Sequence, residues 1–130
     1  MKAILALGFL LSMACMAADD VTAGKYAGTW EGGAANGDFR LTLAKDTDGK
    51  LTPEVVFTLS GDEVKTKVTS FQIDGAKVKF VYTFDLQGNH LESSAEGERK
   101  GDTVEGKYTT RLLPDGGAID AGTWRATLTQ

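Results

Sequence analysis

Cysteine and histidine are almost absent from this 130-residue chain, which contains one of each, Cys15 and His90. Cys15 lies in an N-terminal segment that we expect to be removed, so the mature chain would have no disulfide, thiolate metal site or cysteine nucleophile. His90 adjoins a Gly-Asn turn, and no partner for acid–base catalysis can be named for it. The sequence therefore identifies no catalytic residues and favours a role other than catalysis.

Motifs for metals and cofactors are also missing. Asp46-Thr47-Asp48-Gly49 resembles the start of a calcium loop, but Phe57 stands where the twelfth-position Glu is needed, so we interpret it as a hairpin turn. Glu92, Glu96 and Glu98 alternate along one predicted strand on its outer face, where solvated carboxylates are expected. No phosphate-binding loop or zinc motif occurs. The sequence predicts no metal site and no cofactor.

A cluster of positive charge is missing as well. The chain has 14 Lys and Arg against 18 Asp and Glu, a formal net charge of −4, and no basic cluster. Loss of Lys2 with the N-terminal segment would make the mature chain more acidic still. Binding to nucleic acid or to anionic lipid surfaces by electrostatics is therefore not expected.

The N-terminus has the layout of a secretory signal. Lys2 precedes an apolar run over residues 3–14, and the small residues Ala17 and Ala18 precede the acidic pair Asp19-Asp20. The apolar run is shorter than the roughly 20 residues that span a bilayer, so no transmembrane span is expected in the mature chain.

These features predict a signal helix over residues 1–18, cleaved near Ala17 or Ala18, and a single domain over residues 19–130. The protein is then secreted or periplasmic, and the compact signal favours a bacterial source. The alternative is a lipoprotein signal in which Cys15 carries the lipid, although Ser12-Met13-Ala14 departs from the usual residues before that cysteine.

Apolar and polar residues alternate with period two through the rest of the chain. One such run places Val78, Phe80, Tyr82, Phe84 and Leu86 on a single face, with polar residues and Val81 between them. This pattern predicts strands with one buried and one wet face, and almost no helix after residue 20.

Short turn sequences rich in Gly, Asn and Asp separate these runs and predict antiparallel hairpins. Eight strands are expected, over residues 25–31, 38–45, 51–59, 63–73, 77–86, 90–98, 103–111 and 122–129. The fourth changes parity between Val68 and Phe71, which predicts a bulge or corner near Thr69-Ser70.

The tripeptide Gly-Thr-Trp occurs in both the first and the last predicted strand, as Gly28-Thr29-Trp30 and Gly122-Thr123-Trp124. Antiparallel pairing of these strands would close an eight-stranded up-and-down β-barrel and leave no open edge. The alternative is a two-layer β-sandwich. Outward charges such as Lys65, Lys77 and Lys79 exclude a barrel that faces lipid.

Gly28-Thr29-Trp30 in the first strand of such a meander resembles the calycin group, which includes the lipocalins, avidins and fatty-acid-binding proteins. The resemblance implies a small barrel that holds a ligand inside. It also implies that Trp30 packs across the closed end of the barrel beneath an arginine, either Arg111 or Arg125.

An eight-stranded barrel is just wide enough to be filled by side chains or to hold one small ligand. Small residues on one wall, Ser93, Ala95, Gly97 and Gly106, face large aromatic ones, which means either interlocked packing or an apolar cavity. For the second case we expect an apolar or aromatic ligand to contact the inward-facing residues Trp30, Phe57, Tyr82, Tyr108 and Trp124.

Two functions remain open at this stage. One is binding of a small apolar ligand inside the barrel. The other is a filled β-domain that acts through its surface as an interaction or envelope-associated module. The sequence specifies neither the ligand nor the oligomeric state.

Overall fold

The computed structural model of the chain describes residues 20–114 and 116–129. The predicted signal helix, its cleavage site and the lipidation alternative at Cys15 lie outside this part. Within the described part, no helix is long and apolar enough to cross a membrane.

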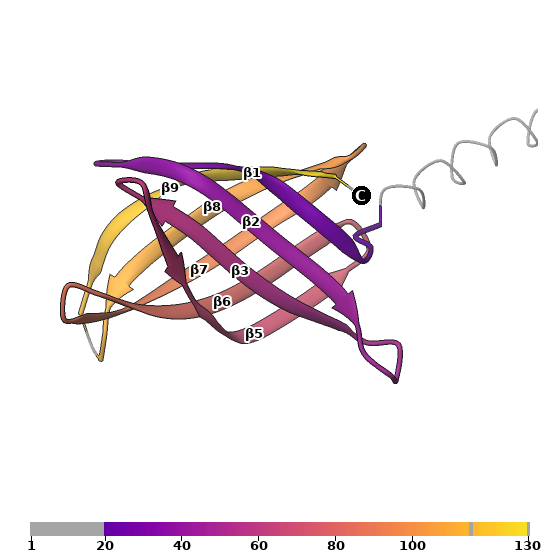
Figure 1. The fold of residues 1–130 in the computed structure, drawn as a ribbon, viewed down its shortest axis with the longest axis horizontal. Helices are drawn as coiled ribbons and strands as arrows, with labels where there is room; N and C mark the ends of the chain where they lie inside the picture. Colours follow the sequence, from indigo (N-terminus) through magenta and orange to yellow (C-terminus); the bar gives the residue numbers. More distant parts are fainter. Residues whose placement is uncertain (1–19, 115, 130) are drawn as a thin grey trace, which may run out of the picture.

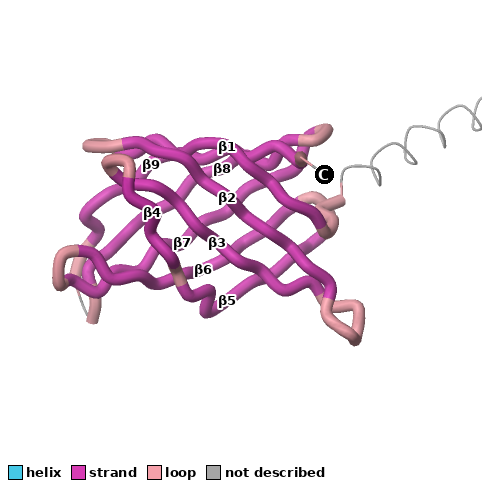
Figure 2. The backbone as a smooth tube through the Cα atoms, in the orientation of Figure 1, coloured by secondary structure: helices cyan, strands magenta, loops and turns pink. Residues whose placement is uncertain are grey.

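The described residues form an all-β structure in which nine antiparallel strands make one curled sheet (Figures 1 and 2). The strands are β1 (Gly24–Gly32), β2 (Asn36–Lys45), β3 (Leu51–Leu59), β4 (Asp62–Lys65), β5 (Lys67–Asp74), β6 (Lys77–Leu86), β7 (Asn89–Lys100), β8 (Thr103–Leu112) and β9 (Ala118–Leu128). Each predicted strand is present, and buried and exposed positions alternate along most of them as the period-two pattern requires.

The ninth strand arises because the fourth predicted strand is divided in two at Thr66. Its first part, β4, pairs with β3, and its second part, β5, pairs with β6. The predicted bulge is also present, since the register of β5 against β6 shifts between Val68 and Ser70. The residue left unpaired by this shift, Thr69, turns Phe71 and Ile73 inward, where both are partly buried.

Pairing of the first and last strands is confirmed. In the ladder between β1 and β9, Trp30 lies directly opposite Trp124, and Gly28 lies opposite Ala126. The strand order is β4-β3-β2-β1-β9-β8-β7-β6-β5, so every strand belongs to a single sheet. A barrel, and not a two-layer sandwich, therefore describes the fold.

The ring closes through the kinked strand that β4 and β5 share. These are the two outer members of the ladder, yet only Thr66 separates them in the chain. The Thr66 hydroxyl donates a hydrogen bond to the Val55 carbonyl of β3 at 2.7 Å. Because the chain passes from one edge of the sheet to the other at this point, the sheet curls back onto itself.

Tight turns keep neighbouring strands antiparallel. Ser60-Gly61 joins β3 to β4, and Gln87-Gly88 joins β6 to β7, with positive φ at both residues of each pair. Two consecutive positive φ values define the two-residue hairpin turn whose twist matches that of the flanking strands. Glycine at the second position adopts this conformation without steric cost.

One end of the barrel is filled by aliphatic side chains and one tyrosine. They have exposed fractions of 1% or less: Tyr26, Leu41, Leu43, Val55, Val78, Val104 and Ala126. Val21, which precedes β1, covers them and donates its backbone N–H to the Gly75 carbonyl at 3.0 Å. This half of the interior leaves no room for a ligand, so we call it the closed end.

Arg99 of β7 completes the closed end. Its guanidinium donates hydrogen bonds to the carbonyls of Gly101 and Asp20 and to the hydroxyl of Thr22. The expectation that Trp30 lies here beneath Arg111 or Arg125 is wrong. Both arginines are exposed on the outer face, because their positions have outward parity on their strands. Trp30 lies toward the other end, next to the β1–β2 loop and opposite Gly37 of β2.

Candidate functional site

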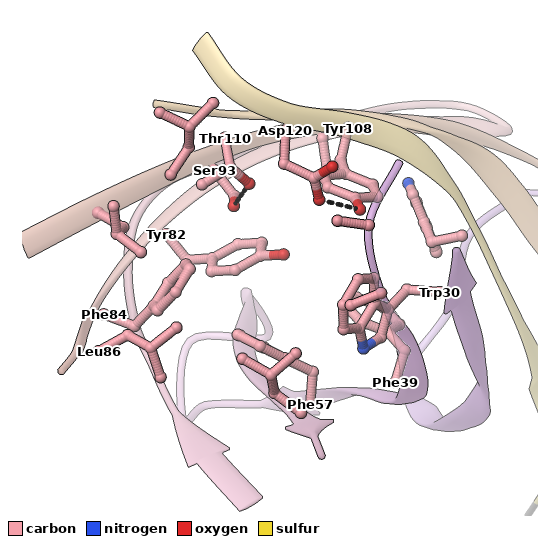
Figure 3. Close-up of a pocket in the computed structure, with 17 residues that line it drawn as sticks. Trp30, Phe39, Phe57, Tyr82, Phe84, Leu86, Ser93, Tyr108, Thr110 and Asp120 are labelled. Atoms are coloured by element: carbon pink, nitrogen blue, oxygen red, sulfur yellow. Dashed lines mark hydrogen bonds between the residues drawn. The ribbon is translucent and has the colours of Figure 1, made fainter. Parts of the chain in front are cut away.

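A cavity of about 220 Å³ occupies the interior toward the end opposite Arg99 (Figure 3). At this end the chain makes the β1–β2 and β8–β9 loops and the turns after β3 and β6. All five predicted ligand-contacting residues line the cavity: Trp30, Phe57, Tyr82, Tyr108 and Trp124. They come from five different strands, and the curling of the sheet brings them together.

Aromatic rings form most of the wall. Trp30 packs edge-to-face against Phe57 at 5.9 Å between ring centroids and against Tyr108 at 6.1 Å. Phe57 in turn packs edge-to-face against Phe84 at 5.0 Å. These arrangements are the favoured ones for aromatic pairs, so each ring helps to hold its neighbour in place around the cavity.

The floor of the cavity is a second aromatic group. Trp124 packs against Phe39 at 5.2 Å and against Phe80 at 5.5 Å. This layer separates the cavity from the closed end. The Trp30 indole N–H donates to the Thr58 carbonyl at 3.0 Å, whereas the Trp124 indole N–H is buried without an acceptor among residues 20–114 and 116–129.

Two interpretations were offered for the wall of small residues, interlocked packing and an apolar cavity, and each describes part of it. Gly97 of β7 leaves space that Trp124 occupies, since a Cβ added there would lie 2.7 Å from its ring, whereas a Cβ at Gly106, its partner on β8, would meet the β7 backbone at Glu96. Farther toward the open end of the same strand, Ser93 and Ala95 line the cavity. Interlocked packing with Trp124 thus explains Gly97, and the close approach of the β7 backbone explains Gly106, while Ser93 and Ala95 border the cavity.

Hydroxyl groups interrupt the apolar wall on one side. Ser93 and Thr110 face each other across β7 and β8, and their hydroxyls are 2.5 Å apart in a buried hydrogen bond. Figure 3 shows the Tyr82 hydroxyl pointing into the open space of the cavity. Burial raises the pKa of Tyr82 to about 12, an effect that hydrogen bonding to Ser93 partly offsets. Tyr82 is therefore a neutral hydroxyl that can both donate and accept.

A carboxylate completes the polar side. Asp120 of β9 accepts a hydrogen bond from the Tyr108 hydroxyl at 2.8 Å through Oδ2 and one from the Gly33 backbone N–H at 2.9 Å through Oδ1. Burial, followed by the hydrogen bond and the negative charge of Asp120, raises the pKa of Tyr108. The two bonds hold the carboxylate at the edge of the cavity between β8 and the β1–β2 loop.

Sequence reasoning missed Asp120 because the last strand was predicted to begin at residue 122. Extending the parity of Trp124 backward by four residues places Asp120 on the inner face, which was the available signal. The register against β8 shifts here, with Thr110 opposite Asp120 and Arg111 opposite Ala118. The extra residue, Ile119, is a bulge at the mouth of the cavity, where bulges commonly re-aim side chains.

The other polar groups considered from the sequence do not form a site. His90 pairs with Asp85 at 2.6 Å, and both side chains are exposed. Asp46 Oδ1 accepts the backbone N–H groups of Asp48 and Lys50, as in a hairpin turn. Across the described ranges, no group of three or more His, Cys, Asp or Glu residues is placed to hold a metal ion.

Comparison with protein-family models, with curated proteins and with solved structures finds no match to this chain.

Proposed function

We propose that this chain is an exported, calycin-like β-barrel that binds one small apolar or aromatic molecule inside the barrel. The observation that carries the proposal is the cavity of about 220 Å³ between an aromatic floor and an aromatic wall. Small-molecule sites are typically concave and mostly apolar, with a few polar groups that orient the ligand. Tyr82, Ser93 and Thr110 would be those groups.

The size of the cavity limits the ligand. An engineered apolar cavity of about 150 Å³ in another protein binds benzene. The cavity in this barrel, at about 220 Å³, suits one substituted ring or a short branched chain, and it is too small for a long acyl chain lying wholly inside.

A surface function is the second candidate. Leu112 and Ile119 are large apolar residues with exposed fractions of 37% and 58%, and both lie by the β8–β9 loop at the mouth of the cavity. Two such residues are normal for a protein surface and do not make a large patch. The partly empty interior favours the binding function over this one.

The experiment is a titration of the chain with a panel of small apolar and aromatic compounds, followed by tryptophan fluorescence. Trp30 and Trp124 both line the cavity, so an occupant is expected to change their emission in a saturable way. The test variant is Ala95→Leu, which places three extra carbons into the cavity. The control is Ser94→Leu, one position along β7 on the outer face.

Ala95→Leu is expected to weaken binding about tenfold or more by filling the space, while Ser94→Leu leaves the affinity unchanged. Far-UV circular dichroism confirms that both variants are folded. Saturable binding that is equal in the two variants would place the ligand outside the barrel. Absence of any saturable change across the panel would contradict the proposed function.

A further inference from the structure

The charges around the cavity restrict the ligand further. Among the described residues that line it, Asp120 is the only acid, and none is Lys, Arg or His. Arg111 of β8 is paired with Glu92 at 2.8 Å on the outer face and does not neutralise Asp120. A ligand in the cavity therefore meets one negative charge and no positive one.

The Asp120 carboxylate can accept more hydrogen bonds than it receives. Its two oxygens take one bond each, from Tyr108 and from Gly33. A carboxylate has about four acceptor positions. The two existing bonds fix its orientation, and the remaining acceptor capacity is available to a donor on a ligand. Asp120 is also only partly buried, so a ligand can approach it.

The aromatic rings beside Asp120 also favour a cation. Tyr108, which bonds Asp120, packs at 6.1 Å and 85° against Trp30, and Figure 3 shows both rings on the same side of the cavity as the carboxylate. The faces of Trp and Tyr rings attract ammonium groups, most strongly where water is excluded. A carboxylate with adjacent indole and phenol rings thus presents complementary electrostatics to an amine.

We propose that the cavity selects a small molecule with an aromatic or apolar body and one positively charged amine, whose ammonium group binds Asp120. This inference rests on the proposed function, because it names the ligand class of the same cavity. Tyr82 would contact the body or a polar substituent through its hydroxyl. Carboxylate ligands of similar size are disfavoured, since they would bring a second negative charge into an apolar site without a cation to pair it.

The experiment compares three probes with nearly the same skeleton and different charge: 2-phenylethylamine, 2-phenylethanol and 3-phenylpropionate. Each is titrated into the chain at pH 7 and low salt, and the affinity is measured by calorimetry. The amine is expected to bind about tenfold or more tighter than the alcohol, as charge-assisted bonds exceed neutral ones, and the carboxylate is expected not to bind.

Asp120→Asn removes the charge and keeps the size of the side chain. We expect it to weaken amine binding about tenfold and to leave alcohol binding within about threefold. The control is Asp62→Asn, which makes the same change of net charge at an exposed position at the start of β4, at the same end of the barrel. It is expected to change neither affinity.

The outcomes separate the two proposals. Binding of the alcohol as tightly as the amine to the unaltered chain would overturn the amine selectivity and leave the proposed function standing. Equal loss of amine affinity in Asp62→Asn and Asp120→Asn would also overturn it, because the effect would then be one of net charge. Failure of the whole panel of apolar compounds and of these probes would overturn both.

Discussion

At the residue scale, the interior contains a few polar groups, and most of them have a specific hydrogen-bond partner. The buried pair Ser93 and Thr110 is the clearest case, because the two hydroxyls bond each other at 2.5 Å on the cavity wall. The barrel carries a second hydroxyl pair of the same type, Thr103 and Thr127 at 3.0 Å, which is exposed. The two pairs allow the effect of burial to be isolated.

Ser93→Ala is expected to lower the free energy of unfolding by about 1–3 kcal/mol, since the Thr110 hydroxyl is left buried without its partner. Adding Thr110→Val should restore part of the loss, because both polar groups are then gone. Thr103→Ala, at the exposed pair, should cost no more than about 0.5 kcal/mol. Urea unfolding measures all three. Equal losses of unfolding free energy in Ser93→Ala and Thr103→Ala would show that burial does not increase the contribution of the hydroxyl pair.

Because of Tyr82, the stability of the barrel is expected to vary with pH in the alkaline range. Burial raises its pKa to about 12 in the folded chain, from 10.0 in an exposed tyrosine. Below pH 10 the phenol is protonated in both states and the stability is unaffected by it. Between about pH 10 and 12 only the unfolded chain releases this proton, so the free energy of unfolding falls as the pH rises.

The contribution of one such group is at most about 1.4 kcal/mol per pH unit. Urea midpoints measured from pH 9 to pH 12 should therefore fall less steeply in Tyr82→Phe than in the unaltered chain. The comparison removes the effect of the lysines, which titrate in the same range in both proteins. Parallel curves for the two proteins would mean that Tyr82 ionises in the barrel as freely as in water.

At the scale of the strands, one glycine, Gly97, determines where the filled part of the interior ends. Gly97 of β7 and Gly106 of β8 are opposite each other, and the Trp124 ring lies against Gly97. Because Gly97 has no side chain, the indole fits against β7 and contacts Phe39 and Phe80, and the three rings form the cavity floor.

Gly97→Ala is expected to displace Trp124, because the new Cβ would lie 2.7 Å from its ring. Overpacking of this kind costs about 1–3 kcal/mol, and we expect a shifted tryptophan emission and weaker ligand binding as well. Gly117→Ala is the control, since a Cβ there meets nothing within 4 Å. Thermal unfolding and fluorescence measure both variants. An unchanged emission in Gly97→Ala would argue against this account of the floor.

At the scale of the whole molecule, the two ends of the barrel differ, since one is filled by side chains and the other holds the cavity. The closed end is tied together by Arg99, which bonds Asp20 and Thr22 before β1 and Gly101 after β7. These partners are far apart in the chain, so one buried guanidinium links the residues before β1 to the turn between β7 and β8. The other end has only loops around the cavity mouth.

Arg99→Met is expected to lower the free energy of unfolding by about 1–3 kcal/mol, because several acceptors lose their donor while the aliphatic stem is kept. The amide of Val21, bonded to the Gly75 carbonyl, should then exchange with solvent faster. Arg125→Met, on the outer face, is the control and should leave both quantities unchanged. Unaltered Val21 exchange in Arg99→Met would show that the closed end is held by apolar packing alone.

Most of the strands, their inward faces and the bulge near Ser70 could be predicted because each depends on local information. The period-two pattern assigns faces along a strand, and glycine with Asp or Asn marks each turn. The five cavity residues were found for the same reason, since parity alone placed Trp30, Tyr82 and the others on the inner face. The division at Thr66 was not found, because it depends on which neighbour each half of the strand pairs with.

The sequence by itself determined that this chain folds as an all-β meander with aromatic side chains inside, because periodicity and turn residues act over a few positions. Only the tertiary structure decided that one half of the interior is filled and the other holds a cavity. That division depends on whether side chains from strands far apart in the chain meet, as Trp124 meets Gly97 while Ser93 faces open space. The pairing of Asp120 with Tyr108 and Gly33 is of the same kind, because only the curled sheet and its loops bring these groups together.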